Sequence, residues 1–250
     1  MILTSKNNPL IKETASLKDK KARKSLGMFL VEGVKMVNEA KKCGLEIDRV
    51  FIAQDMDIAF DFDEEKTVYV SFDVMKFLCD EKTPQGVVCR VKIPSYTLQK
   101  PTGACLVLDG VADPKNMGAI IRTANASGYK EIYLTDDCTD PYSPKSVRAS
   151  MSGVFFTKIY QGTREEILEK LENTPILVAD MQGENIFSYD APERFALVIG
   201  NEGNGVSQLL KSKANGVVKI PMQSTQESLN ASVSAGILMY LLKRKSFLDE

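Results

Sequence analysis

The stretch Phe195-Ala-Leu-Val-Ile-Gly-Asn-Glu-Gly-Asn-Gly205 runs an apolar strand into a loop with three glycines and one carboxylate. A second short strand, Gly216-Val-Val-Lys-Ile220, leads through a polar segment into a helix. Neighbouring strands of an α/β sheet that end in such loops form a crevice at their carboxyl ends, where these sheets bind ligands. We therefore expect the chemistry of this protein in its C-terminal half.

The composition is that of an ordinary soluble globular protein, with 250 residues, 44% hydrophobic and 26% charged. No apolar run approaches the roughly 18–20 residues that span a bilayer, and the N-terminus lacks the pattern of a signal peptide. The five cysteines show no CxxC spacing, which favours reduced thiols. We expect a cytoplasmic protein without a membrane partner, a disulfide or a metal site.

The chain contains no histidine. This excludes a Ser-His-Asp triad, a Cys-His pair, a His-ligated metal and a histidine general base. Any proton transfer must therefore use another side chain, a water molecule or the substrate itself.

Positive charge is concentrated near the N-terminus. Residues 1–42 contain ten Lys and Arg against four Asp and Glu, although the whole chain has a net charge of −1. One interpretation is a basic arm that docks an anionic partner, and the other is a solvated helix face. The side chains of this arm are Lys18, Lys20, Lys21, Arg23 and Lys24.

The chain divides into two α/β regions. Residues 1–92 predict a small α/β domain, the proline-containing stretch 93–103 a linker, and residues 104–250 a second domain. The later strands are near-continuous apolar runs, which favours a parallel sheet with helices on both faces. We expect helices at 12–26, 32–43, 116–127, 164–172, 206–214 and 228–243, and strands at 28–31, 50–53, 68–70, 87–91, 105–109, 131–135, 154–160, 176–180, 195–200 and 217–220.

Two further segments contain polar side chains suited to chemistry. Arg122 lies in a helix of otherwise small or apolar residues, where it either pairs with a carboxylate or holds a phosphate or a hydroxyl. Lys145 and Arg148 lie among serines, and cations and hydroxyls in this density suit phosphate and sugar contacts. The alternative for this second segment is a helix start, with Ser143 as cap and Pro144 in the first turn.

The loop from Gly200 to Gly205 matches neither GxGxxG nor GxxxxGK[ST], and Glu202 would repel a phosphate. It suits an uncharged or zwitterionic ligand that the backbone approaches closely. Ser228 and Asn230 open the last helix, where they either leave backbone N–H groups to a ligand or cap the helix.

Three blocks of this sequence resemble the motifs of the SpoU (TrmH) family of RNA ribose 2'-O-methyltransferases, in the SPOUT superfamily. The resemblance covers about residues 104–244, and the first region is similar to the small L30-like substrate-binding domain of such enzymes. The segments that carry it are Asn116…Arg122-Thr-Ala, Ile199–Gly205, Ile220-Pro-Met222…Ser228-Leu-Asn230 and, in the first region, Phe29-Leu-Val-Glu-Gly33.

The resemblance implies a deep trefoil knot, a homodimer and methyl transfer from S-adenosylmethionine to a ribose of structured RNA. Large-subunit (23S) rRNA is the first expectation for the substrate, and tRNA is the alternative. The implied cofactor-binding residues are Met181, Gly200, Asn201, Ile220, Met222, Leu229 and Asn230. The implied catalytic residues are Arg122, Asn116, Glu202, Ser228 and Asn230. The basic arm, together with Lys145 and Arg148, is then expected to bind RNA.

Loss of the proton from the ribose hydroxyl has two routes in such a site. Arg122 polarises the hydroxyl or accepts its proton, or an RNA phosphate held by Arg122 accepts it. Glu202 is expected to orient Asn116 or Arg122 through a charge-assisted hydrogen bond rather than to act as the base.

Two rival classes of protein remain to be weighed. A non-catalytic RNA-binding protein of the same fold would have no need of the intact Asn116, Arg122, Glu202 and Asn230. A nucleotide hydrolase or dinucleotide oxidoreductase would need a phosphate-binding motif that this sequence lacks.

Overall fold

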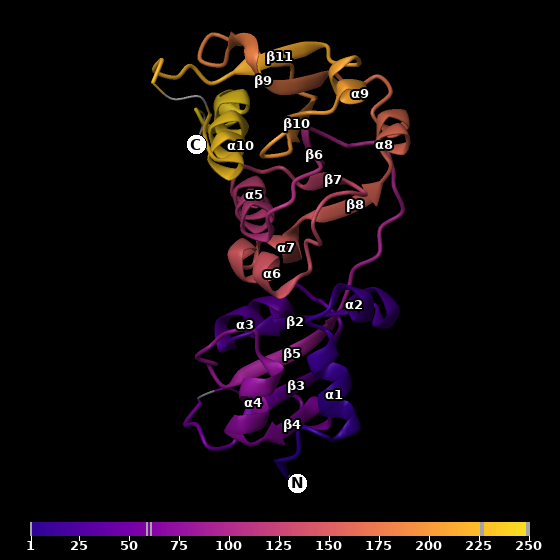
Figure 1. The fold of residues 1–250 in the computed structure, drawn as a ribbon, viewed down its shortest axis with the longest axis vertical. Coiled ribbons are helices and arrows are strands. Elements are labelled where there is room, and N and C mark those ends of the chain that lie inside the picture. The colour runs from indigo at the N-terminus through magenta and orange to yellow at the C-terminus, as the bar shows by residue number, and fades with distance from the viewer. Residues whose placement is uncertain (1, 59, 61, 226–227, 249–250) are drawn as a thin grey trace. The chain divides into compact units, whose positions relative to one another are not determined.

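The computed structural model describes residues 2–58, 60, 62–225 and 228–248. The chain forms two compact units (Figure 1). Unit 1 comprises Met1–Ser95 with Asp140–Phe155, and unit 2 comprises Tyr96–Thr139 with Phe156–Glu250. Within the described part of the chain, no helix is long and apolar enough to cross a membrane.

Unit 1 is built on a mixed five-stranded sheet in the order β1-β4-β3-β5-β2. Strands β1, β4 and β3 are parallel, and β5 is antiparallel to both β3 and β2. The strands are β1 (Ile2–Leu3), β2 (Met28–Glu32), β3 (Ile47–Ala53), β4 (Thr67–Val70) and β5 (Val87–Lys92).

Helices α1 (Pro9–Ser16) and α4 (Phe72–Leu78) contribute to the main core of unit 1. Every second residue of the central strands points into this core, as the pleat requires, and Leu30, Phe51 and Val88 are examples. Helix α3 (Val34–Lys42) packs against β2 and β5. A short turn, η1 (Glu64–Lys66), precedes β4.

The expected helix at 12–26 is interrupted and forms two helices, α1 and α2 (Lys20–Leu26). Asp19 caps α2 by accepting a hydrogen bond from the backbone N–H of Lys21, and Gly27 ends it with a φ of 62°. A local cap therefore overrides a continuous helical pattern.

Residues 140–155 pack on unit 1, although they follow two strands of unit 2 in the sequence. The ring of Phe29 lies 5.0 Å from that of Tyr142 and 6.4 Å from that of Phe155. The segment forms α6 (Pro144–Ser150) and α7 (Gly153–Phe156). The strand expected at 154–160 is therefore wrong in its first half, because a short buried apolar run has the same pattern in a strand and in a helix.

Unit 2 contains a six-stranded parallel sheet in the order β11-β9-β10-β6-β7-β8. Its strands are β6 (Cys105–Asp109), β7 (Glu131–Thr135), β8 (Lys158–Gly162), β9 (Ile176–Asn185), β10 (Ala196–Gly200) and β11 (Gly216–Lys219). The expected parallel sheet is confirmed, and β9 runs five residues beyond its expected end at 180.

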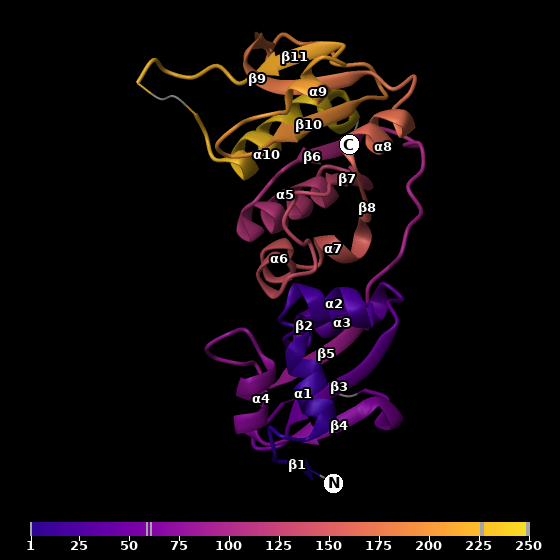
Figure 2. The same ribbon diagram turned by 45° about the vertical axis from the view of Figure 1, so that its right-hand side comes forward.

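Helices cover both faces of this sheet, as the apolar strands predict. In Figure 1, α5 (Pro114–Ala126) and α10 (Ala231–Leu242) lie on one side, and α8 (Arg164–Lys170) and α9 (Gln208–Lys211) lie on the other. Helix α10 packs against α5 and β10, and Figure 2 shows α10 beside β10 in a second view. Helix α9 is shorter than the expected 206–214, and a final turn, η2 (Arg244–Phe247), follows α10.

The expected linker at 93–103 forms neither helix nor strand. Its second half nevertheless packs on unit 2, because the backbone carbonyl of Gln99 accepts a hydrogen bond of 3.0 Å from the hydroxyl of Tyr133. Leu98 contacts the core of the same unit.

Candidate S-adenosylmethionine site

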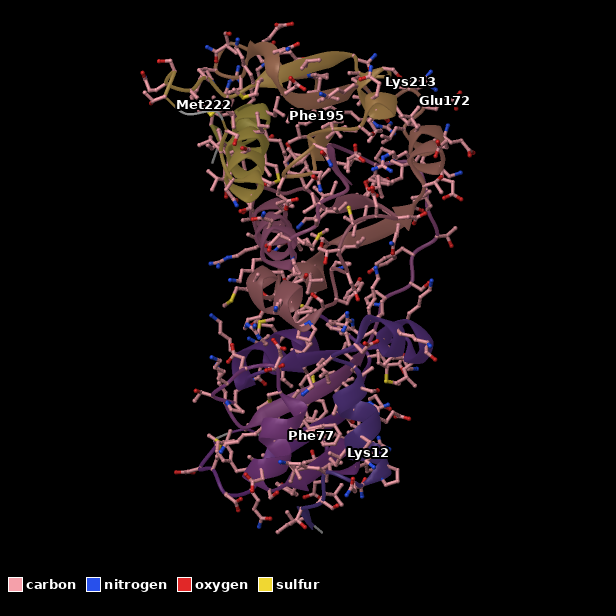
Figure 3. All side chains as sticks on the ribbon, viewed as in Figure 1. Lys12, Phe77, Glu172, Phe195, Lys213 and Met222 are labelled. Carbon is pink, nitrogen blue, oxygen red and sulfur yellow. The ribbon has the colours of Figure 1, made fainter. Side chains whose placement is uncertain are left out.

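A cavity of about 410 Å³ lies at the carboxyl ends of β9, β10 and β11 and at the start of α10. This is the edge of a parallel sheet where loops from neighbouring strands converge. Figure 3 labels Met222 on the segment between β11 and α10. The lining residues are Ala179, Asp180, Met181, Ile199, Gly200, Asn201, Glu202, Gly205, Val218, Lys219, Ile220, Met222, Ser228, Leu229, Asn230, Ala231, Ser234 and Leu238.

The glycine-rich loop after β10 closes back on itself. Asn201 and Gly205 exchange two backbone hydrogen bonds of 3.0 and 2.9 Å. A Cβ on Gly200 would lie 2.2 Å from the carbonyl carbon of Gly205, a distance that no side chain tolerates. Gly205 itself has a φ of +67°, which favours glycine. The backbone therefore forms this wall of the cavity directly.

A chain of polar side chains crosses from this loop to the last helix. The amide nitrogen of Asn116, in the first turn of α5, donates to Glu202 Oε1 at 2.9 Å. The amide nitrogen of Asn230 donates to Asn116 Oδ1 at 3.0 Å. Three residues that are far apart in the sequence thus form one hydrogen-bonded row.

Glu202 is held as a carboxylate. Burial acts to raise its pKa, but the Asn116 amide and the backbone N–H groups of Ala112 and Asp113 donate to it and outweigh burial, so that the pKa is lowered. A carboxyl with a lowered pKa is a weak base. The hydrogen bond between them is the contact through which Glu202 is predicted to orient Asn116.

Asn230 serves two purposes at once. Its Oδ1 accepts hydrogen bonds from the backbone N–H groups of Ser232 and Val233, which makes it the N-cap of α10. Its Nδ2 is the donor to Asn116. The two interpretations of this helix start, as a cap and as part of a site, are therefore compatible.

The residues of the cavity fit S-adenosylmethionine. Gly200 allows the backbone of the loop to fold back within 2.2 Å of where a Cβ would lie, so that the cavity is lined here by backbone rather than by a side chain. Ile220, Met222 and Leu229 give the cavity an apolar lining that would suit the cofactor, and Glu202 and Asn230 add polar groups.

The structure brings most of the expected site residues together. Met181, Gly200, Asn201, Glu202, Ile220, Met222, Ser228, Leu229 and Asn230 line the cavity, and Asn116 joins them through its hydrogen bonds. Arg122 is exposed on α5 and is not among the lining residues. Its side chain therefore does not face the core, unlike its apolar neighbours in the helix.

Sequence reasoning missed several residues of this cavity, among them Asp180, Lys219 and Ser234. Asp180 directly follows an apolar run, and this change from apolar residues to a charged one was the signal in the sequence that could have pointed to it. Its carboxylate forms an ion pair of 2.6 Å with Lys211, and the hydrogen bond from Lys211 lowers its pKa.

The basic side chains of unit 1 differ in their availability. Lys20, Lys21, Lys24 and Lys145 are exposed. Lys18 donates to the backbone carbonyl of Phe77 at 2.6 Å. Arg148 pairs with Asp80 at 3.2 Å and with Glu81 at 3.5 Å.

Arg23 differs from the expectation of an RNA-binding side chain. It is 3% exposed, and its guanidinium forms an ion pair of 2.7 Å with Asp140 and donates to the carbonyls of Leu17 and Lys18. These acceptors occupy its donors, so Arg23 is a structural residue and we remove it from the expected RNA contacts. Ser143 caps α6 with Pro144 in its first turn, as the structural alternative for that segment predicts.

Comparison with known proteins agrees with this architecture. Residues 103–240 match the SpoU rRNA Methylase family, and residues 8–89 match the MRM3-like substrate binding domain. The chain belongs to the SpoU rRNA methylase family.

Individual relatives cover nearly the whole chain. The chain is 29% identical, over 96% of its length and 98% of the relative, to the 23S rRNA (guanosine(2553)-2'-O)-methyltransferase RlmP of Bacillus subtilis. It is 30% identical, over 98% and 94% of the two chains, to an uncharacterized tRNA/rRNA methyltransferase of Synechocystis. The crystal structure of an AdoMet-bound rRNA methyltransferase from Sinorhizobium meliloti superposes with a TM-score of 0.88, at 27% identity, covering 98% of each chain.

Proposed function

We propose that this protein transfers a methyl group from S-adenosylmethionine to the 2'-hydroxyl of a ribose in RNA. The observation that carries the proposal is the cavity at the carboxyl ends of β9, β10 and β11, bordered by the Glu202–Asn116–Asn230 row. The family match and the AdoMet-bound relative support it. A binding protein without catalysis is the alternative, and it would have no use for this polar row.

S-adenosylmethionine supplies an activated methyl group, so the protein has mainly to provide position and electrostatics. The backbone at Gly200 and the side chains of Ile220 and Leu229 hold the donor, and the apolar walls exclude water. Holding the reacting atoms in line at roughly 3 Å can contribute about 7–11 kcal/mol. Asn116 is fixed from both sides, by Glu202 and by Asn230, and is available to orient the RNA.

We assign the handling of the ribose hydroxyl to Arg122. Its guanidinium polarises the hydroxyl and stabilises the developing alkoxide, or holds an RNA phosphate that accepts the proton. Arg122 is exposed beside Thr123, and the methyl of Thr123 would lie 3.5 Å from a Cβ on Gly236 of α10. The exposure of Arg122 supports the proposal that a second molecule reaches its guanidinium.

We infer that this second molecule is a copy of the chain and that the protein acts as a homodimer. The last helix supports this, because it is largely apolar and leaves two large side chains, Val233 and Tyr240, 50% and 43% exposed. A dimer formed over this face would bring Arg122 of one subunit toward an active site at the interface. We also propose that the C-terminal segment is knotted, as the family resemblance implies, and the packing of α10 on α5 and β10 is compatible with this.

We propose 23S rRNA as the substrate, with tRNA as the second candidate, and unit 1 as the part that docks the RNA. The relative RlmP, named for 23S rRNA, covers nearly the full length of the chain and supports the first choice. The free and mostly buried cysteines suit a cytoplasmic protein. Mapping of 2'-O-methyl sites in total RNA, with and without the protein, separates the two substrates.

Arg122→Ala provides the test of the catalytic assignment. We expect the variant to lose most of its methyl transfer, at least about a hundredfold, because a donor to the developing charge is removed. Binding of S-adenosylmethionine, measured by calorimetry, should persist because Arg122 does not line the cavity.

Lys115→Ala, an exposed change on the same helix, is the matched control and should retain activity. Undiminished methylation by Arg122→Ala would remove Arg122 from the mechanism. Failure of the unmodified protein to bind S-adenosylmethionine would refute the proposed function itself.

A further inference from the structure

Asp109 is a buried charge in the middle of the sheet of unit 2. It ends β6, directly opposite Gly200 in the parallel register of β6 and β10, and is 1% exposed. The other residues of β6 are apolar. Burying a carboxylate is costly unless it is paired and hydrogen-bonded, so such a residue needs a reason.

Both oxygens of this carboxylate are engaged. Oδ1 accepts a hydrogen bond of 2.7 Å from Arg164 Nε, at the start of α8. Oδ2 accepts one of 2.6 Å from the backbone N–H of Ser207, two residues after Gly205. Asp109 therefore joins a cation on one side to the end of the glycine-rich loop on the other.

The beginning of that loop is attached to the same strand end. The amide nitrogen of Asn201 donates to the carbonyl of Gly110 at 2.7 Å. The Oδ1 of Asn201 accepts from the N–H groups of Gly203 and Asn204 within the loop. The loop is thus tied at both ends to two consecutive residues, Asp109 and Gly110.

The guanidinium of Arg164 is itself held in place by further hydrogen bonds. Arg164 donates a second hydrogen bond of 2.7 Å to Asp137, and Thr135 donates to the other oxygen of Asp137 at 2.6 Å. The hydroxyl oxygen of Thr135 accepts from the N–H of Gly110 at 2.9 Å, which closes a ring of contacts. The hydrogen bond that Arg164 donates to Asp137 raises the pKa of the guanidinium, which stays charged.

We propose that Asp109, balanced by Arg164, is a positioning residue that holds the Gly200–Gly205 loop in the shape that receives S-adenosylmethionine. The inference rests on the proposed function, because it takes this loop as one wall of the cofactor site. Asp109 acts through the backbone of Ser207 and does not line the cavity itself.

Asp109→Asn tests the proposal with little change of volume. The two donors, Arg164 and Ser207, approach different oxygens of the carboxylate. In asparagine one of these oxygens is an NH2 group, which cannot accept, so the hydrogen bond either to Ser207 or to Arg164 is lost. We expect the dissociation constant of S-adenosylmethionine, measured by calorimetry on the full chain, to rise about tenfold. Arg164→Lys keeps the positive charge, but a lysine cannot donate to Asp109 and Asp137 in the same way. This variant should raise the dissociation constant of S-adenosylmethionine by a smaller factor.

Asp140→Asn is the matched control, because it breaks another largely buried Asp–Arg pair, with Arg23 in unit 1. It should lower the melting temperature and leave cofactor affinity unchanged. A purely structural role for Asp109 would give the same result, a lower melting temperature with unaltered affinity, and would overturn the proposal. If Asp109→Asn does not fold, Arg164→Lys provides the test instead. Unaltered affinity of that variant for S-adenosylmethionine would also overturn the proposal.

A failure of this proposal can be distinguished from a failure of the proposed function. If the unmodified protein binds no S-adenosylmethionine, the proposed function fails. If it binds the cofactor and both variants bind it equally well, only the positioning role fails. RNA affinity, measured by filter binding, should stay within about twofold of the unmodified protein in both variants.

Discussion

Single residues in this site have more than one structural task. Asn230 uses its oxygen to cap α10 and its nitrogen to hold Asn116. Glu202 accepts both from the Asn116 amide and from backbone N–H groups at the start of α5. Gly200 is required by a close approach of backbone to backbone, since its own φ is not in the left-handed region. For Asn230 and Glu202 one of these contacts is with a distant segment, and for Gly200 the contact lies within its own loop.

The glycines of the loop after β10 provide a direct comparison at the scale of one residue. Gly200→Ala should abolish cofactor binding, because the new Cβ would lie 2.2 Å from Gly205 and the loop must open. Gly203→Ala should be tolerated, because its Cβ would meet only Asn201 Oδ1, at 3.5 Å. Calorimetric titration with S-adenosylmethionine distinguishes the two, and equal affinities would show that the loop is not a wall of the site.

At the scale of elements, the start of α10 contributes both to the packing of the fold and to the cofactor site. Helix α10 is apolar, buries Ala235, Leu238 and Met239, and begins at the cavity. Its N-cap belongs to the same polar row as α5 and the loop after β10. An element that packs on the sheet therefore also sets the position of Asn116.

Asn230→Asp separates the two tasks of the cap. Aspartate still accepts from the N–H groups of Ser232 and Val233, and its charge is favourable at a helix N-terminus, so stability should be maintained. It has no N–H to donate to Asn116, and methyl transfer should fall about tenfold.

Asn230→Ala loses the cap as well and should be less stable by about 0.5–2 kcal/mol. Urea unfolding and a methylation assay measure both effects. Full activity in Asn230→Asp would show that the row is not needed for catalysis.

At the scale of the whole molecule, charge is distributed unevenly between the parts of the chain. The basic side chains of residues 1–42 are those expected to attract RNA, in a protein with a net charge of −1. The fold divides them into exposed lysines, such as Lys20, Lys21 and Lys24, and a buried arginine, Arg23. Only the exposed group is available to phosphates.

Replacing Lys20, Lys21 and Lys24 together by alanine should weaken RNA binding and reduce its salt dependence. Each phosphate contact contributes about 0.7–0.9 to the slope of log affinity against log salt, so loss of three should lower the slope by about 2–3. Replacing the exposed Lys100, Lys158 and Lys213 of unit 2 is the control. Equal slopes for the two triple variants would argue against the basic arm as the RNA contact.

Much of the fold could be predicted from the sequence, because short apolar runs such as 105–109 and 131–135 are typical of the buried strands of a parallel sheet. The split of the first helix depended on one cap, at Asp19, and the helix at 153–156 on packing around Phe29. Half of the cavity residues were predicted through the resemblance to a known family. The role of Asp109 was not predicted, because a carboxylate at a strand end has no feature in the sequence that distinguishes a buried charge from a solvated one.

The sequence by itself determined the class of fold, the family and the segments that form the cofactor site, since periodicity and short motifs are local properties of the chain. Only the tertiary structure decided that Glu202, Asn116 and Asn230 form one row, that Arg23 is buried and that Asp109 ties the loop after β10. These are contacts between residues about 85 to 120 positions apart in the chain. Hydrogen bonds and burial depend on distance in space, and the chain fixes that distance only when it folds.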